Sequence, residues 1–137
     1  MDGKVDLLIL NGTLVTASDI FQADIAIADE KIVAVGRNLV HQGLAGDIEA
    51  LDAVGLLVYP GGVDPHVHLQ YPQGPHRVVS SDDWFTGTVA AACGGTTTLI
   101  DFVEADPDET WMDAYEERLA QADLQATIDY GFHMSFN

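Results

Sequence analysis

Two histidines separated by one valine, His66 and His68, are the residues of this sequence best suited to chemistry. They end the stretch 60–68, PGGVDPHVH, in which a turn leads into a short strand. Because side chains alternate between the two faces of a strand, both imidazoles are expected on one face. Two imidazoles held in that way can bind one transition metal ion such as zinc. Paired histidines also occur as core or surface residues, so the spacing alone leaves both interpretations open.

The first sixty residues contain short β-prone runs separated by turn residues. Asn11-Gly12 predicts a hairpin turn between strands at 6–10 and 13–16, and Asp29-Glu30 predicts a second hairpin. The expected strands of the second hairpin and of the rest of the module are 23–28, 31–35, 48–52 and a buried strand at 56–59. These runs predict a small antiparallel sheet module over residues 1–60.

From residue 61 onward the pattern alternates between strands and helices. After the strand that ends near His68, we expect a helix capped by Ser80 or Ser81 and ended by Gly94-Gly95, with an apolar face of Phe85, Val89 and Ala92. The remaining predictions are a strand at 96–102, a helix from Asp106-Pro107 with an apolar stripe at Trp111, Tyr115, Leu119 and Ala122, and a strand at 126–133. This order predicts a parallel sheet with right-handed crossovers.

Composition limits the partners and the location. The net charge is −17, from 22 acidic and 5 basic residues spread along the chain, which makes nucleic acid and anionic membranes poor partners. A solvated acidic surface accounts for this charge more simply than adaptation to high salt. The sequence shows no apolar run of about 18 residues and no secretion signal, so we expect a cytoplasmic protein. The single cysteine, Cys93, is expected to be a buried packing residue.

Three segments carry a resemblance to a known family. They are the Gly-X-Asp-X-His-X-His strand at 62–68, the run TVAAACGGTTTLIDF at 88–102, and DYGFHM at 129–134. Together they resemble the dihydropyrimidinase and D-hydantoinase family of cyclic amidohydrolases. The resemblance implies an α/β chain: the N-terminal part of a metal-dependent hydrolase, with a small β-sandwich module over 1–60. The first three strands and two helices of an incomplete (β/α)8 TIM barrel would follow over 61–137.

The resemblance also implies a site. Such enzymes hold two zinc ions, and the positions of His66 and His68 bind the more buried one. A carboxylated lysine, two further histidines and a proton-transferring aspartate would lie beyond Asn137, so no catalytic residue is expected in this stretch. Leu69 and Tyr71 fall in a loop that shapes the substrate pocket, although a solvent-facing role suits them nearly as well.

Other polar residues of this region receive smaller roles. Asp64 is expected to steady the turn, and Asp101 to support the metal ligands from behind. By the same resemblance, His133 would pack in the barrel instead of binding metal. His76 lies in an insert, 74–77, that departs from hydantoinase patterns, and we expect it at the surface.

The implied activity is hydrolytic opening of a cyclic amide, a dihydropyrimidine or a hydantoin, by a complete enzyme that forms a homotetramer. Dihydroorotase and allantoinase share the histidine pair and remain alternatives. A non-catalytic dihydropyrimidinase-related protein is a third alternative, although retention of both histidines argues against it. A complete barrel takes about 250 residues, and only about 75 follow the first module. We therefore expect this sequence to be a fragment, inactive alone.

Overall fold

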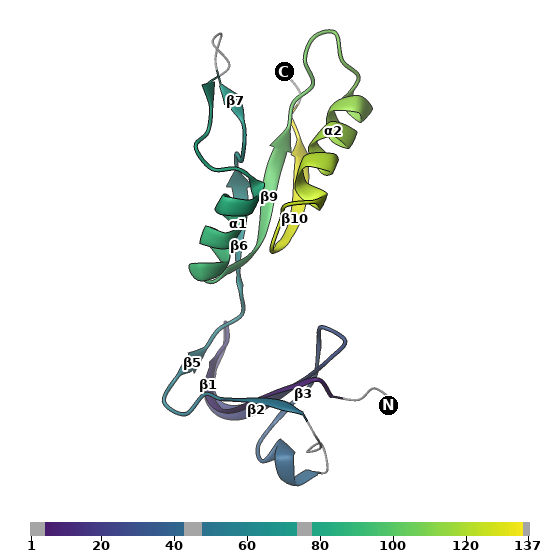
Figure 1. Ribbon diagram of the computed structural model, residues 1–137. Helices are drawn as coiled ribbons and strands as arrows, with labels where there is room; N and C mark the ends of the chain where they lie inside the picture. The colour runs from purple at the N-terminus through teal and green to yellow at the C-terminus, as the bar shows by residue number, and fades with distance from the viewer. Residues whose placement is uncertain (1–4, 43–47, 74–77, 136–137) are drawn as a thin grey trace. The chain divides into compact units, whose positions relative to one another are not determined.

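The computed structural model describes residues 5–42, 48–73 and 78–135, and the predicted surface position of His76 lies outside these ranges. The chain divides into two compact units, residues 1–60 and 61–137. Figure 1 shows a strand-rich first unit and a second unit in which helices alternate with strands.

The first unit is built on one five-stranded mixed sheet. Its strands are β1 (Leu7–Val15), β2 (Ile20–Ala28), β3 (Lys31–Gly36), β4 (Glu49–Asp52) and β5 (Leu57–Val58), and a short 3-10 helix, η1, spans Leu39–Gln42. The strand order is β3-β2-β1-β4, and β5 also pairs with β1. The predicted antiparallel module is wrong for β4 and β5, because both run parallel to β1.

The predicted hairpin at Asn11-Gly12 is also wrong, because β1 runs through both residues without turning. Asn11 adopts a left-handed conformation with φ of 61°, and the register with β2 shifts between Ile9 and Gly12. The Asn11 backbone N–H donates to Asp24 Oδ1 at 2.8 Å. The left-handed residue that was expected in a turn therefore lies in a β-bulge within β1.

The second predicted hairpin is confirmed. Asp29 and Glu30 both have positive φ, and Lys31 pairs with Ala28 directly across the turn. One core cluster of this unit consists of Val5, Leu8, Ala26 and Leu39. The strand expected to be buried at 56–59 is mostly exposed, with Leu57 at 58%. The reason is that β5 is a two-residue edge strand that pairs with β1 in the described sheet.

The second unit contains the predicted parallel sheet. Its strands are β6 (Gly62–Val67), β9 (Thr96–Val103) and β10 (Asp129–Met134), in the order β10-β9-β6. All pairings in this sheet are parallel. The two helices, α1 (Trp84–Cys93) and α2 (Trp111–Asp123), contact β9 (Figure 1). A short antiparallel pair, β7 (Pro72–Gln73) and β8 (Val78–Val79), lies between β6 and α1.

The first helix starts later than predicted. Its N-cap is Asp83, which forms a capping box with Thr86, whereas Ser80 and Ser81 lie upstream. Its buried residues are Trp84 and Thr88, so the predicted apolar face is displaced by one residue, and Phe85 is 54% exposed. The Trp84 ring takes the core position because it is fully buried against Leu99 and Ala122.

Two further predictions about this unit need correction. Cys93 is exposed, because it ends α1 beyond the last buried turn. The second helix begins at Trp111 with Thr110 as its N-cap, since residues 106–109 close a separate turn through the Glu109 N–H to Asp106 carbonyl bond of 3.0 Å. The strand predicted from residue 126 starts at Asp129. Across the described ranges, no helix combines the length and apolar character needed to span a bilayer.

Candidate metal centre

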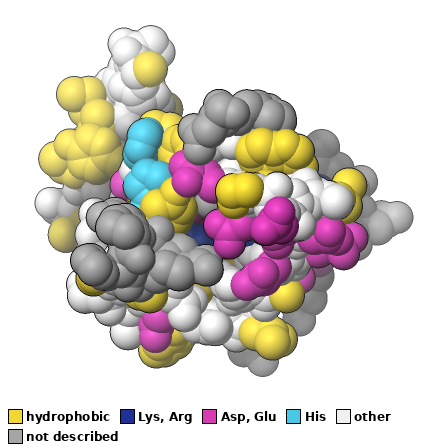
Figure 2. Space-filling view, turned by 90° about the horizontal axis from the view of Figure 1, so that it is seen from above, with side chains coloured by type: hydrophobic (Ala, Val, Ile, Leu, Met, Phe, Trp, Pro, Cys, Tyr) yellow, Lys and Arg dark blue, Asp and Glu magenta, His cyan; other side chains and the backbone are white. Residues whose placement is uncertain are grey.

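The C-terminal ends of the parallel strands meet at one edge of the sheet. His66 lies near the end of β6, Phe102 near the end of β9 and His133 near the end of β10. Figure 2 shows this end of the second unit, where histidine side chains adjoin hydrophobic and acidic side chains. The edge therefore gathers polar groups from segments far apart in the sequence.

The His66 and His68 rings converge. Their Nε2 atoms lie 3.3 Å apart, and the ring planes are almost perpendicular, at 80°. The register of β6 with β9 shifts between Asp64 and Val67, so a bulge shapes the strand just before the second histidine. Asp64 Oδ1 accepts the His66 backbone N–H at 3.1 Å, which confirms that this carboxylate steadies the local backbone.

The separation of the two nitrogens suits a shared metal ion. Two nitrogens bound to zinc at about 2.0–2.1 Å with a tetrahedral angle lie roughly 3.4 Å apart. The observed Nε2 separation of 3.3 Å matches that edge. His68 Nδ1 is buried and has no hydrogen-bond partner among the described residues. In metal-bound histidines the second ring N–H usually donates to an oxygen acceptor.

Phe102 forms the floor beneath the histidines. Its ring centroid lies 4.5 Å from that of His66, 5.0 Å from that of His68 and 5.1 Å from that of His133. His133 Nε2 lies 3.2 Å from the Pro65 carbonyl oxygen, which is within hydrogen-bond distance. His133 therefore serves in packing and in bonding to β6.

Leu69 and Tyr71, which were predicted to line the substrate pocket, occupy different surroundings. The Tyr71 ring lies 4.6 Å from the His68 ring, and its hydroxyl donates to Glu104. Burial, followed by the hydrogen bond and the charge of Glu104, raises the pKa of Tyr71 to about 12. The phenol therefore remains a protonated donor at neutral pH. Leu69 instead turns into the core beside Trp84 and Leu99.

A buried ion pair lies directly behind this edge. Asp101 is fully buried and accepts from Arg118 at 2.7 Å. Sequence reasoning gave Asp101 a supporting role and assigned none to Arg118, which lies 17 residues further along the chain. The available signal was an arginine placed within the apolar stripe of the second helix, among Tyr115, Leu119 and Ala122.

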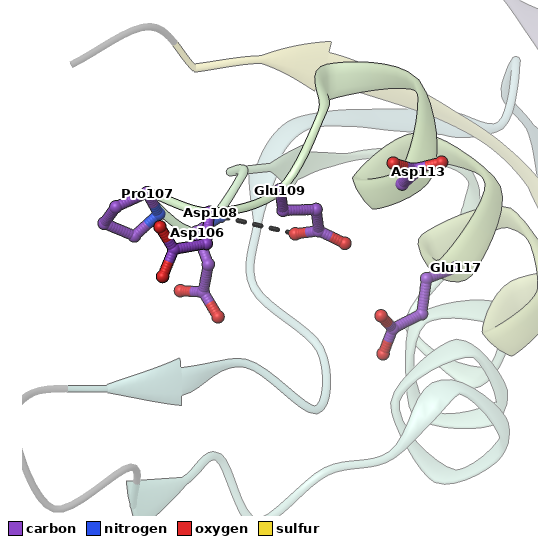
Figure 3. Close-up of a pocket in the computed structure, with 6 residues that line it drawn as sticks. All are labelled: Asp106, Pro107, Asp108, Glu109, Asp113 and Glu117. Carbon is purple, nitrogen blue, oxygen red and sulfur yellow. Dashed lines mark hydrogen bonds between the residues drawn. The ribbon is translucent and has the colours of Figure 1, made fainter.

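An acidic pocket lies where β9 leads into α2. It is lined by Asp106, Pro107, Asp108, Glu109, Asp113 and Glu117, and Figure 3 shows the Asp106 N–H bonded to a carboxylate oxygen of Glu109. Over the described residues, no three His, Cys, Asp or Glu side chains are grouped to hold a metal ion. The histidine pair therefore offers two imidazole nitrogens without a third candidate ligand beside them in the described part of the chain.

Comparison with known proteins places this geometry in context. The chain is 50% identical over 127 residues to a D-hydantoinase of Geobacillus stearothermophilus. The matched region covers 93% of this chain and 26% of that protein. It is 40% identical to dihydropyrimidinase 2 of Caenorhabditis elegans, over 96% of this chain and 24% of that protein. A crystal structure of D-hydantoinase superposes with a TM-score of 0.87 at 45% identity, over 95% of this chain and 27% of that chain.

This chain is a homologue of the D-hydantoinases and dihydropyrimidinases. It spans about a quarter of the length of these relatives. Its fold is that of the N-terminal portion of a D-hydantoinase, as the resemblance implied. No protein-family model matches the sequence.

Proposed function

We propose that this chain contributes the first two metal ligands, His66 and His68, of a hydrolase that opens cyclic amide rings. The supporting observation is the convergence of the two Nε2 atoms to 3.3 Å at the C-terminal edge of a parallel sheet. In barrel enzymes this edge carries the chemistry. The similarity to proteins named D-hydantoinase and dihydropyrimidinase supports a hydantoin or a dihydropyrimidine as the substrate class.

The metal we propose is zinc, as a pair of ions in the complete enzyme. When bound, the ions would lower the pKa of a water molecule and polarise the carbonyl of the ring. In this chain His66 and His68 would hold one ion, and Phe102 would fix both rings from below. Tyr71 would remain a neutral hydrogen-bond donor beside the site, because burial and then Glu104 raise its pKa.

We also propose that the chain alone has no turnover. Two imidazoles leave a zinc ion without its third protein ligand, and the described residues offer no group of three. General acid–base transfer to the leaving ring nitrogen also needs a positioned group of suitable pKa. Neither requirement is met by His66 and His68.

Zinc titration of the chain by calorimetry tests the proposal. We expect binding of one ion, weakened by about tenfold or more in both His66→Ala and His68→Ala, because each variant removes half of the protein ligands. His133→Gln is the matched control, since it keeps a side-chain donor near Pro65 and should change affinity by less than about twofold. The zinc-loaded chain should open neither hydantoin nor dihydrouracil.

Equal affinity in all three variants would show that zinc binds elsewhere and would remove the basis of the proposal. Ring opening that requires zinc and is lost in His68→Ala would contradict only the proposed lack of turnover.

A further inference from the structure

The residue that follows His68 is held through both of its backbone polar groups. The Leu69 backbone N–H donates to Asp101 Oδ2 at 3.1 Å, and the Leu69 carbonyl accepts from Arg118. The same Asp101 oxygen accepts from Arg118 at 2.7 Å. One buried ion pair thus satisfies the donor and the acceptor of the residue adjacent to the second histidine.

The ion pair is buried and contacted by further side chains. Asp101 is 0% exposed on the central strand β9, and Arg118 is 8% exposed on α2. Arg118 also donates to Gln121 at 2.9 Å, and its guanidinium carbon lies 5.0 Å from the centre of the Trp84 ring. A buried charge pair is costly to desolvate, and here Arg118 Nε has no hydrogen-bond partner among the described residues. A core role alone does not explain why both charges are directed at the Leu69 backbone.

The backbone just beyond Leu69 needs such an anchor. Gln70 has φ of 47°, a left-handed conformation that side-chain-bearing residues rarely adopt. Its N–H donates to the Asp82 carbonyl at 2.9 Å. The chain therefore leaves β6 through a sharp, strained bend immediately after His68, and the backbone of Leu69 joins that bend to the histidine.

We infer that the Asp101–Arg118 pair is a positioning device that holds His68 in its metal-binding orientation by fixing the backbone N–H and carbonyl of Leu69. This inference rests on the proposed function, because it assigns the pair to the metal site. Neither residue touches the ion. Both act through Leu69, across 32 and 49 residues of sequence.

The test compares Asp101→Asn and Arg118→Lys with Thr88→Val in the full chain. Asp101→Asn keeps the shape but removes the charge, and Arg118→Lys keeps the charge but removes the planar fork. Thr88 is a matched control because it is also fully buried and hydrogen-bonded in the same unit, to Thr127 and the Trp84 carbonyl. Among the described residues, the hydrogen bonds of its side chain reach Trp84, Phe85 and Thr127 and none of residues 66–69.

Two measurements are made on each variant: Co²⁺ affinity from visible absorption, and the NMR signals of the His68 ring and the Leu69 amide without metal. We expect the Co²⁺ affinity of both pair variants to fall by about tenfold. Their His68 ring signals should broaden, and their Leu69 amide hydrogen should exchange with solvent faster. Thr88→Val should keep its Co²⁺ affinity within about twofold of the unsubstituted chain, with unchanged His68 signals. We expect this even if its melting temperature falls as far as those of the two pair variants.

Affinity and ring signals that follow thermal stability equally in all three variants would overturn the inference. If the unsubstituted chain binds no Co²⁺, the proposed function fails. The NMR comparison then judges the positioning role separately, and an ordered His68 ring in Asp101→Asn would refute it.

Discussion

At the scale of single residues, His68 is surrounded by contacts that restrict its ring. Phe102 lies beneath it, Tyr71 beside it and His66 across from it. The convergence of the two histidines was predictable, because alternation along a strand is a local property. The Arg118 contact was not predictable, since it depends on helix α2 packing over a peptide 49 residues earlier.

Tyr71 gives a pH-dependent prediction at the same scale. Its folded pKa of about 12 exceeds the usual value of 10.0, so the native state resists ionisation of this phenol. The contribution of Tyr71 to stability should therefore be complete below pH 10 and should be lost as the pH rises from about 10 to 12.

Urea unfolding measured at several alkaline pH values checks this prediction. The Tyr71→Phe variant should show a shallower decline in unfolding free energy over that interval than the unsubstituted chain. Tyr130→Phe provides a comparison, because its pKa is also raised to about 12 by burial and by Asp123, away from the histidines. Identical declines with and without the Tyr71 hydroxyl would contradict the raised pKa of Tyr71.

At the scale of elements, the sequence predicted the order of strands and helices better than their ends. Apolar runs marked the three parallel strands, and a glycine pair at 61–62 or 94–95 marked the start of the first two. The helix starts were misplaced because Asp83 and Thr110 satisfy the first N–H groups better than the upstream serines or Asp106. Asn11-Gly12 supports a bulge as well as a turn, and only the pairing with β2 decides between them.

The packing of α1 against the segment after His68 predicts the effect of a single methyl group. A Cβ at Gly87 would lie 2.4 Å from Leu69 Cδ2, and Leu69 cannot move freely because it is buried in the core. We expect Gly87→Ala to lower the free energy of unfolding by about 1–3 kcal/mol through overpacking.

Gly131→Ala is the matched control for this substitution. A Cβ at Gly131 meets nothing within 4 Å, so we expect a neutral effect or a gain of up to about 1 kcal/mol. Urea unfolding of both variants provides the measurement. A similar loss in both would show that contact with Leu69 is not the cause.

At the scale of the whole molecule, the chain combines a mixed sheet unit with a strand and helix unit, and each leaves apolar side chains exposed. Ile20 is 71% exposed in the first unit, and Leu124 is 89% exposed in the second. The division near residue 60 coincides with the change in sequence pattern. The exposure of these apolar side chains was harder to predict. Apolar periodicity indicates which residues favour burial, but it does not show which contacts bury them.

The central claim is that His66 and His68 bind the same metal ion. Zinc K-edge X-ray absorption on the zinc-loaded chain tests it most directly, with His68→Ala measured beside it. We predict scattering from two imidazole nitrogens at about 2.0–2.1 Å, reduced to one imidazole in the variant. A zinc spectrum with only oxygen neighbours, or one unchanged by the loss of His68, would contradict the account.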